Sequence, residues 1–238
     1  ITPASTSSFS AENPARLVIP KAAKRAWEKL GRVAKNSLSV GFGVMSAQET
    51  PGGRVAMAVA DATQRPVIVR SGAFVGAQSA DLDGQIDAIG EGPFDVAMMM
   101  VGANDVTHRV LPSASVAHLS AALERLAALG VPTVLGTCPD LGTVRPIPHP
   151  LRALCREWSR SLARRQRDAV ESWGGLAVSL GDHLGPEFAA NPHEMFGPDR
   201  FHPSSAGYAT AAAALAPAVL DRLGAGRRPR PTPEPAGA

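Results

Sequence analysis

The chain has 238 residues, 45% of them hydrophobic and only 5% aromatic, so it is long enough to bury one large core built mainly from Ala, Val and Leu. Its formal net charge of +3 comes from 24 basic and 21 acidic residues without a clear basic stripe, which argues against a nucleic-acid partner. No run reaches the roughly 18–20 apolar residues that span a bilayer, so we predict no transmembrane segment.

The amino-terminal part of the chain gives the weakest structural signal. Residues 1–12 are small and polar and are predicted to be disordered, while Asn13-Pro14 opens a segment through Leu30 whose apolar residues suit one face of a helix. The short apolar piece Leu30–Ala34 is then predicted to be a strand that leads to Ser37. The polar start suits a spacer after a removed export signal or simply a shortened chain, so we favour a secreted or cell-envelope location without excluding the cytoplasm.

Beyond Pro51, strand-like and helix-like stretches alternate. Continuous apolar runs, typical of strands buried on both faces of a parallel sheet, occur at Pro66–Arg70, Phe94–Val101, Val131–Thr137 and Leu176–Leu180. Apolar residues at helical spacing lie between them, from Val116 to Leu126 and from Leu151 to Leu162, and a last helix is expected from Ser204 to Leu223. This alternation predicts an α/β fold, a three-layer α/β/α sandwich with a central parallel, flavodoxin-like sheet of about five strands. We expect one domain over residues 13–225 and a disordered Pro/Arg-rich tail over 226–238.

In such folds the functional site lies at the carboxyl ends of the strands, and two turns there carry suitable residues. Gly102-Ala103-Asn104-Asp105 follows the run Phe94–Val101, and the amide of Asn104 can face a developing oxyanion there. Gly76 follows the run Pro66–Arg70, and its backbone N–H is a further candidate donor. Each fragment alone is also compatible with an ordinary turn, because Gly, Asn and Asp are common turn residues.

A late loop supplies a candidate acid–base pair. Asp199 precedes His202 by three residues, a spacing that lets the carboxylate accept a hydrogen bond from Nδ1–H and leaves Nε2 free to act as a base. The alternative is a solvated loop without function. Ser37 requires such a base to attack an ester, and it follows the first predicted strand at the same sheet edge; otherwise it is a turn or cap residue.

The cysteines and the remaining histidines give no sign of a metal site. Cys138 and Cys155 lack a Cys-x-x-Cys spacing, and two free buried thiols are favoured over one disulfide. Five histidines lack ligand spacing and receive no role: His108, His118, His149, His183 and His193. Three consecutive methionines, Met98–Met100, are expected to belong to the core. We therefore predict no metal and no cofactor.

Taken together, these motifs resemble the SGNH hydrolases, also called the GDSL esterase/lipase family, and especially its actinobacterial members. The resemblance covers roughly residues 30–222 and rests on Asn36-Ser37 with Gly41 and Gly43, Gly76-Ala77 with Asp81-Leu82, Gly102-Ala103-Asn104-Asp105, and Asp199-Arg200-Phe201-His202-Pro203. It implies a two-step acyl transfer in which Ser37 attacks the ester, His202 and Asp199 form the base pair, and Ser37, Gly76 and Asn104 hold the oxyanion. The implied substrate is a small-molecule, lipid or sugar ester, and the oligomeric state is left open.

One motif departs from the family pattern. The family's Gly-Asp-Ser is Lys35-Asn36-Ser37 here, so the pre-organisation of the nucleophile loop is altered although the serine is retained. Two alternatives to an ester hydrolase therefore stay open. An acyltransferase or deacylase acting on a sugar or lipid ester would use the same residues, and a catalytically impaired binding module would account for Lys35-Asn36. Loops 141–150 and 185–198 are expected to shape the substrate pocket.

Overall fold

The computed structural model describes residues 15–18, 47–74, 76–90 and 92–225. Its central sheet has five parallel strands in the order β2-β1-β3-β4-β5, the flavodoxin-like order that the sequence predicts. The strands are β1 (Ala15–Val18), β2 (Val67–Arg70), β3 (Val96–Met100), β4 (Thr133–Gly136) and β5 (Leu176–Val178). All strands therefore end at the same edge of the sheet.

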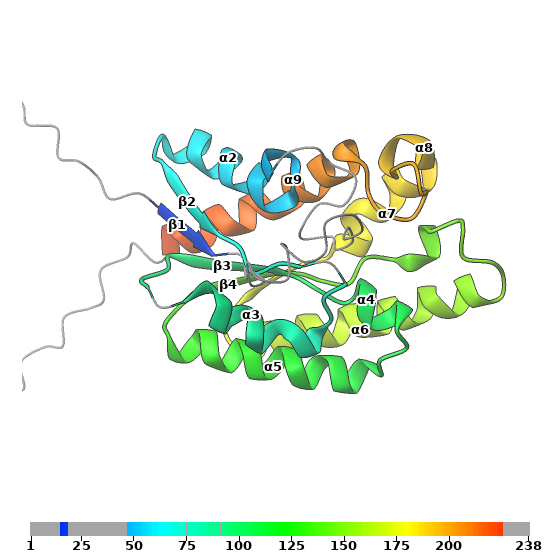
Figure 1. Cartoon of the computed structure of the whole chain (residues 1–238), viewed down its shortest axis with the longest axis horizontal. Helices are drawn as coiled ribbons and strands as arrows, with labels where there is room; N and C mark the ends of the chain where they lie inside the picture. The colour runs from blue at the N-terminus through cyan, green and yellow to red at the C-terminus, as the bar shows by residue number, and fades with distance from the viewer. Residues whose placement is uncertain (1–14, 19–46, 75, 91, 226–238) are drawn as a thin grey trace, which may run out of the picture.

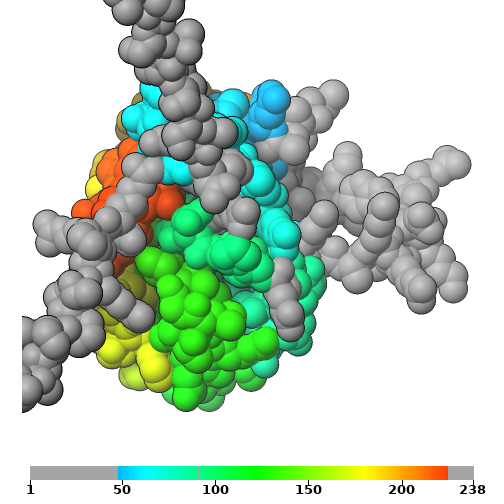
Figure 2. Space-filling model, turned by 90° about the vertical axis from the view of Figure 1, so that its left-hand side faces the viewer, coloured from blue at the N-terminus to red at the C-terminus, as the bar shows by residue number. Residues whose placement is uncertain are grey.

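Helices cover both faces of the sheet, which gives the predicted three layers (Figure 1). On one face lie α2 (Pro51–Thr63), α7 (Leu180–Ala190) and α9 (Ser205–Ala225); on the other lie α3 (Leu82–Ile89), α5 (Pro112–Ala128) and α6 (Leu151–Ser172). Figure 2 views the molecule from the side and shows α9 and α5 in different layers. The short helices are α4 (Ala103–Thr107), α8 (Pro192–Met195), η1 (Ala47–Glu49), η2 (Ser79–Asp81) and η3 (Leu141–Thr143).

The period-2 geometry of β3 explains why its apolar run is continuous. Val96 and Met98 pack into the core that contains α2 and α9, whereas Ala97 and Met99 pack into the core that contains α3 and α5. Each of these four side chains is at most 2% exposed. The methionines are core residues on this strand, as predicted, and β3 separates the two helical layers.

One predicted element at the amino terminus is wrong. Ala15–Val18 lies in the segment that was expected to be a helix, but it forms β1, which is hydrogen-bonded between β2 and β3. Pairing on both sides stabilises a strand of only four residues, an effect that its own apolar spacing does not reveal. The predicted strand Leu30–Ala34 and the tails 1–12 and 226–238 lie outside the described residues.

Local capping fixes the ends of two helices that approach the site. Thr50 accepts a hydrogen bond from the Gly53 N–H at 3.1 Å and starts α2. Ser204 accepts the Gly207 N–H at 3.1 Å and starts α9. Within the described part of the chain, no helix is both long and apolar enough to cross a membrane.

Candidate active site

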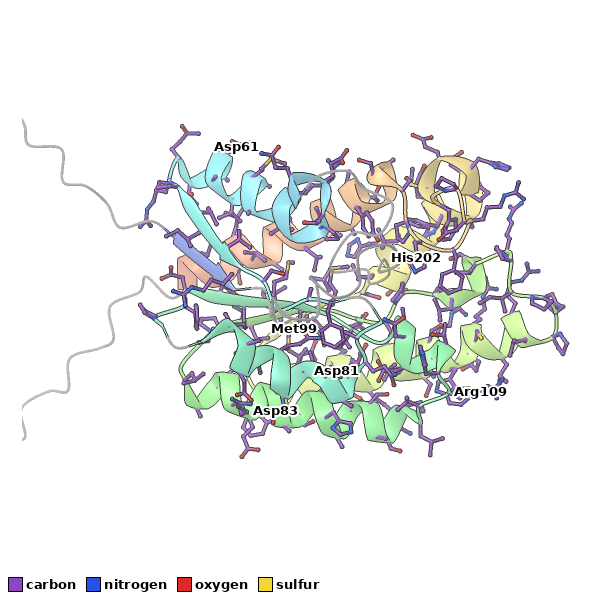
Figure 3. The ribbon with its side chains drawn as sticks, in the orientation of Figure 1. Asp61, Asp81, Asp83, Met99, Arg109 and His202 are labelled. Carbon is purple, nitrogen blue, oxygen red and sulfur yellow. The ribbon has the colours of Figure 1, made fainter. Side chains whose placement is uncertain are left out.

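A cavity lies at the carboxyl edge of the sheet, where the fold rule places it. Part of its lining comes from the turns that follow successive strands and from the loop between α8 and α9, and the polar side chains there are those of Asn104, Asp140 and His202. Figure 3 shows His202 beyond the carboxyl ends of the strands, whereas Asp61 lies at the far end of the same helical layer. Residues 77, 104 and 202 are thus gathered from distant parts of the sequence.

The opposite wall of the cavity is apolar. It is formed by side chains that include Leu141, Val144, Leu184, Phe188, Phe196 and Phe201. The two segments that were expected to shape the pocket both contribute, but 185–198 is mainly helical, and residues 145–150 do not line this cavity. The site therefore combines a few polar groups with a surface suited to a hydrocarbon chain.

Asp199 and His202 form the predicted pair in a tight turn. Asp199 Oδ2 lies 2.6 Å from His202 Nδ1, and its Oδ1 accepts the backbone N–H groups of Phe201 and His202, both at 3.0 Å. Arg200, between them, adopts a left-handed φ of 55°, which folds the turn back. Because the carboxylate holds Nδ1, acid–base chemistry at this ring would use Nε2.

The same contacts keep the carboxylate ionised. Partial burial alone raises the pKa of Asp199, but the hydrogen bonds from the His202 ring and from the Phe201 and His202 N–H groups outweigh it and lower the pKa below its usual value. The ordinary pKa of an aspartate is about 3.9, so Asp199 carries its negative charge at neutral and mildly acidic pH. A fixed negative charge beside the ring is what a histidine base requires.

Asn104 and Gly76 occupy neighbouring turns. The Asn104 amide lines the cavity and donates one hydrogen bond to the Ala77 carbonyl at 2.9 Å, which holds the side chain in place and leaves a second N–H. Gly76 adopts φ +78°, a conformation that L side chains rarely adopt, so a glycine suits this turn. Ala77, the residue after Gly76, reaches the cavity lining.

A buried aspartate that the sequence reading left without a role supports these turns. Asp105 is 0% exposed, and both of its carboxylate oxygens lie 3.1 Å from the Ser79 N–H. Ser115 of α5 also donates to Asp105 Oδ1 at 2.8 Å. Asp105 thereby connects the turn after β2, the turn after β3 and the start of α5, and it fixes the relative positions of Gly76 and Asn104.

Gln166 holds the next pair of strand ends together. This residue of α6 is 0% exposed; its Oε1 accepts the Cys138 N–H at 2.7 Å and its Nε2 donates to the Val101 carbonyl at 3.0 Å. Gly102 makes the close approach possible, because a Cβ there would lie 2.8 Å from Cys138 Cβ. The turns after β3 and β4 thus share one side-chain bridge.

We expect Gln166→Leu to lower the free energy of unfolding by about 1–3 kcal/mol, because the buried Cys138 N–H loses its partner while the side-chain volume changes little. Urea denaturation of both proteins measures the difference. The neighbouring exposed residue provides the control: Arg165→Leu should stay within about 0.5 kcal/mol of the unsubstituted protein. Equal effects of the two substitutions would show that the bridge does not stabilise the fold.

The thiol beside the cavity is not a competing nucleophile. Cys138 and Cys155 are both free and buried, in agreement with the favoured prediction. Burial raises the pKa of the Cys138 thiol well above its usual value, and the negative charges of Asp105 and Asp140 raise it further. The thiol stays protonated, and the protonated form is a weak nucleophile.

Ser37 lies outside the described residues, in the part of the chain between β1 and α2. Among the described residues that line the cavity, the hydroxyl groups belong to Thr143 and Tyr208, and the Thr143 hydroxyl donates to the Asp140 carbonyl at 2.8 Å. Within the described ranges, no group of three or more His, Cys, Asp or Glu residues is arranged to hold a metal ion.

A flavodoxin-like sheet whose carboxyl edge carries a carboxylate–histidine pair and an asparagine amide has the arrangement expected of the SGNH class of α/β proteins. The chain belongs to the GDSL-like lipase/acylhydrolase family, whose sequence pattern matches residues 36–210. The matched range includes Ser37, Gly76, Asn104, Asp199 and His202.

Similar proteins agree with this assignment. The chain is 43% identical over 193 residues to the GDSL-like esterase Rv1075c of Mycobacterium tuberculosis; the aligned part is 79% of this chain and spans 60% of the length of that relative. The esterase EstA from Pseudoalteromonas sp. has the same fold, with a TM-score of 0.63 at 14% identity over 89% of this chain and 100% of EstA. The lipase/acylhydrolase from Enterococcus faecalis also matches, with a TM-score of 0.63 at 14% identity over 87% and 96% of the two chains.

Proposed function

We propose that the protein hydrolyses carboxylic esters through an acyl-enzyme on Ser37. The observation that carries the proposal is the 2.6 Å contact between His202 Nδ1 and Asp199 Oδ2 at a cavity that Asn104 also lines. The topology supports the choice of nucleophile, because β1 lies between β2 and β3 and its carboxyl end is at the same edge as the turns of Gly76 and Asn104. Ser37 follows β1 in the sequence and falls within the family match.

In the first step, His202 Nε2 takes the proton of the Ser37 hydroxyl while the Ser37 oxygen attacks the ester carbonyl carbon. Asp199 stabilises the imidazolium that forms, because its carboxylate stays ionised beside Nδ1. The tetrahedral intermediate then collapses. Its carbon–oxygen bond to the alcohol breaks, and the alcohol leaves with the proton from His202.

The negative oxygen of the intermediate is held by three donors: the N–H groups of Ser37 and Gly76 and the free N–H of the Asn104 amide. Such donors are effective because they are fixed before the reaction begins. For Asn104 the hydrogen bond to Ala77 supplies this fixation, and Asp105 fixes the turns that carry both residues. In the second step, His202 activates a water molecule that releases the acid and restores Ser37.

The apolar wall is suited to bind the acyl part of the substrate. Phe188, Leu184 and Val144 offer hydrocarbon contacts to the acyl chain, and burial of each methylene contributes about 0.8 kcal/mol. Hydrolysis of a chain-length series, from p-nitrophenyl acetate to palmitate, tests both the activity and this placement. We expect turnover that changes with acyl length; the absence of hydrolysis with every ester would refute the proposal.

Asn104→Ala is expected to lower kcat for the preferred ester by about 10²- to 10³-fold, because one oxyanion donor is lost. The measurement is steady-state hydrolysis, with urea denaturation to show that both proteins are folded. Asn191→Ala is the matched control, since Asn191 is exposed, bonds to Glu187 and does not line the cavity. Equal rates for the Asn104 variant and the control would remove Asn104 from the oxyanion site.

Transfer of the acyl group to added glycerol instead of water would assign the same residues to an acyltransferase.

A further inference from the structure

A second hollow lies beside the cavity and is lined by basic side chains. Arg145, His149, Arg152 and Arg156 line it together with Gly142 and Thr143, and we call it the basic groove. It lies between the segment that follows η3, the first turns of α6 and the end of α7, at the same end of the molecule as His202 (Figures 1 and 3).

The charges in the basic groove are not balanced. Three guanidinium groups face one lining carboxylate, Glu157, which lies 3.6 Å from Arg164 outside the groove. Arg145 and Arg152 donate to neutral backbone carbonyls, of Ala189 and Arg145, each at 3.4 Å. The groove therefore presents a net positive charge.

The loop before the groove fixes one of these arginines. Asp140, only 8% exposed, lies 3.5 Å from Arg156 Nε and 3.1 Å from Arg160 Nη2. Arg156 lies across Gly142, where an added Cβ would come within 2.8 Å of Arg156 Cβ and of Asp140 Oδ1. The absence of a side chain at residue 142 thus lets Arg156 lie in the groove.

The groove and the catalytic cavity are neighbours, because Thr143 lines both. An ester whose acyl chain lies along the apolar wall can therefore extend its alcohol portion past Thr143 toward Arg145 and Arg152. Guanidinium groups bind phosphate and carboxylate oxygens through paired N–H donors.

We propose that the basic groove binds an anionic group on the alcohol portion of the substrate, so that the preferred substrates are esters carrying a phosphate or carboxylate there. This inference rests on the proposed ester hydrolysis. The anion can belong to a soluble ester or to a lipid headgroup, and the binding chemistry is the same. Because Arg145 and Arg156 are exposed and Arg152 is partly exposed, the preference is modest and sensitive to salt.

A matched pair of substrates, which differ only in the carboxylate, tests the proposal: neutral 2-nitrophenyl butanoate and anionic 3-(butanoyloxy)-4-nitrobenzoate. For Arg145→Gln/Arg152→Gln we expect kcat/KM to fall about three- to thirtyfold with the anionic ester and to change less than about twofold with the neutral one. About 0.5 M NaCl should remove most of the difference. Arg165→Gln/Arg167→Gln removes the same charge from exposed positions of α6 outside the groove and should leave both values unchanged. An equal loss in the two double variants, or an equal loss with both esters, would overturn the proposal.

A binding measurement separates this proposal from the catalytic one. Calorimetric titration with 3-hydroxy-4-nitrobenzoate, the product of the anionic ester, requires no turnover. Weaker binding to Arg145→Gln/Arg152→Gln than to the control supports the groove even if no ester is hydrolysed, and equal binding refutes it. Co-sedimentation with phosphatidylglycerol vesicles shows where the anionic group comes from. If only the groove variant no longer co-sediments, the anion belongs to a lipid headgroup. If the protein prefers the soluble anionic ester and does not bind vesicles, the anion belongs to a soluble ester.

Discussion

We expect Ser37→Ala to lower kcat/KM for ester hydrolysis by about 10⁴- to 10⁶-fold. Without the hydroxyl, no acyl-enzyme forms, and only binding and the oxyanion donors remain to assist attack by water. Lys35-Asn36 before the serine changes the loop that normally braces it, so this substitution also decides whether the altered motif supports catalysis. The measurement is initial-rate hydrolysis of the preferred p-nitrophenyl ester.

Ser39→Ala is the matched control, because it removes the same hydroxyl two positions further along the chain. It should keep most of the activity. If Ser39→Ala is the inactive variant, the nucleophile has been assigned to the wrong residue. If neither substitution lowers the rate, the reaction does not use a serine of this segment.

The second large effect is expected at the base. His202→Ala should lower kcat by about 10⁴- to 10⁶-fold, because the proposed acceptor of the Ser37 proton is lost. Asp199→Asn should cost about 10³- to 10⁴-fold, because an amide neither stabilises the imidazolium nor selects the tautomer that leaves Nε2 free. Since the two residues act as a unit, the double variant should be no slower than His202→Ala.

Two exposed residues serve as controls for these variants. His118 lies on α5 and Asp61 on α2, away from the cavity lining. His118→Ala and Asp61→Asn should each retain kcat within about twofold. A rate for Asp199→Asn equal to that of Asp61→Asn would show that the 2.6 Å contact has no part in catalysis.

The sequence predicts most of the sheet because its strands are apolar on both faces. The runs around β2, β3, β4 and β5 are short, rich in branched or long apolar residues, and separated by helical spacing. Ala15–Val18 lacks this signature: it is four residues long, contains Arg16 and follows Asn13-Pro14, which is typical of a helix start. Its identity as a central strand depends on ladders to β2 and β3, and these are long-range contacts.

Candidate site residues were detectable where they stand next to strand ends. Asn104 follows a continuous apolar run that predicts a buried strand. Asp199 lies three residues before His202, a spacing that allows a hydrogen bond between the carboxylate and the ring. Asp105 and Gln166 were missed because their roles are bridges between distant turns. Gln166 nevertheless left a signal, since it falls four residues after Leu162 and four before Val170, on the buried face of α6. A polar residue on an apolar helix face has to find buried partners.

The basic groove could not be predicted from the sequence. Arg145, Arg152 and Arg156 are spread over two elements and look like ordinary solvated charges in the sequence. The turn after η3 brings them to one hollow that touches the cavity through Thr143. Charge gathered by folding is not visible in a net charge of +3.

Labelling by a fluorophosphonate, followed by peptide mass mapping, tests the catalytic serine most directly. Attack by the Ser37 oxygen on phosphorus expels fluoride and leaves a stable phosphonyl ester, so no suitable carboxylic ester needs to be known. We predict one adduct, on the peptide that contains Ser37, which disappears in Ser37→Ala and forms much more slowly in His202→Ala. An adduct on a different residue would contradict the assignment of Ser37, and ester hydrolysis that persists without any adduct would contradict the acyl-enzyme mechanism.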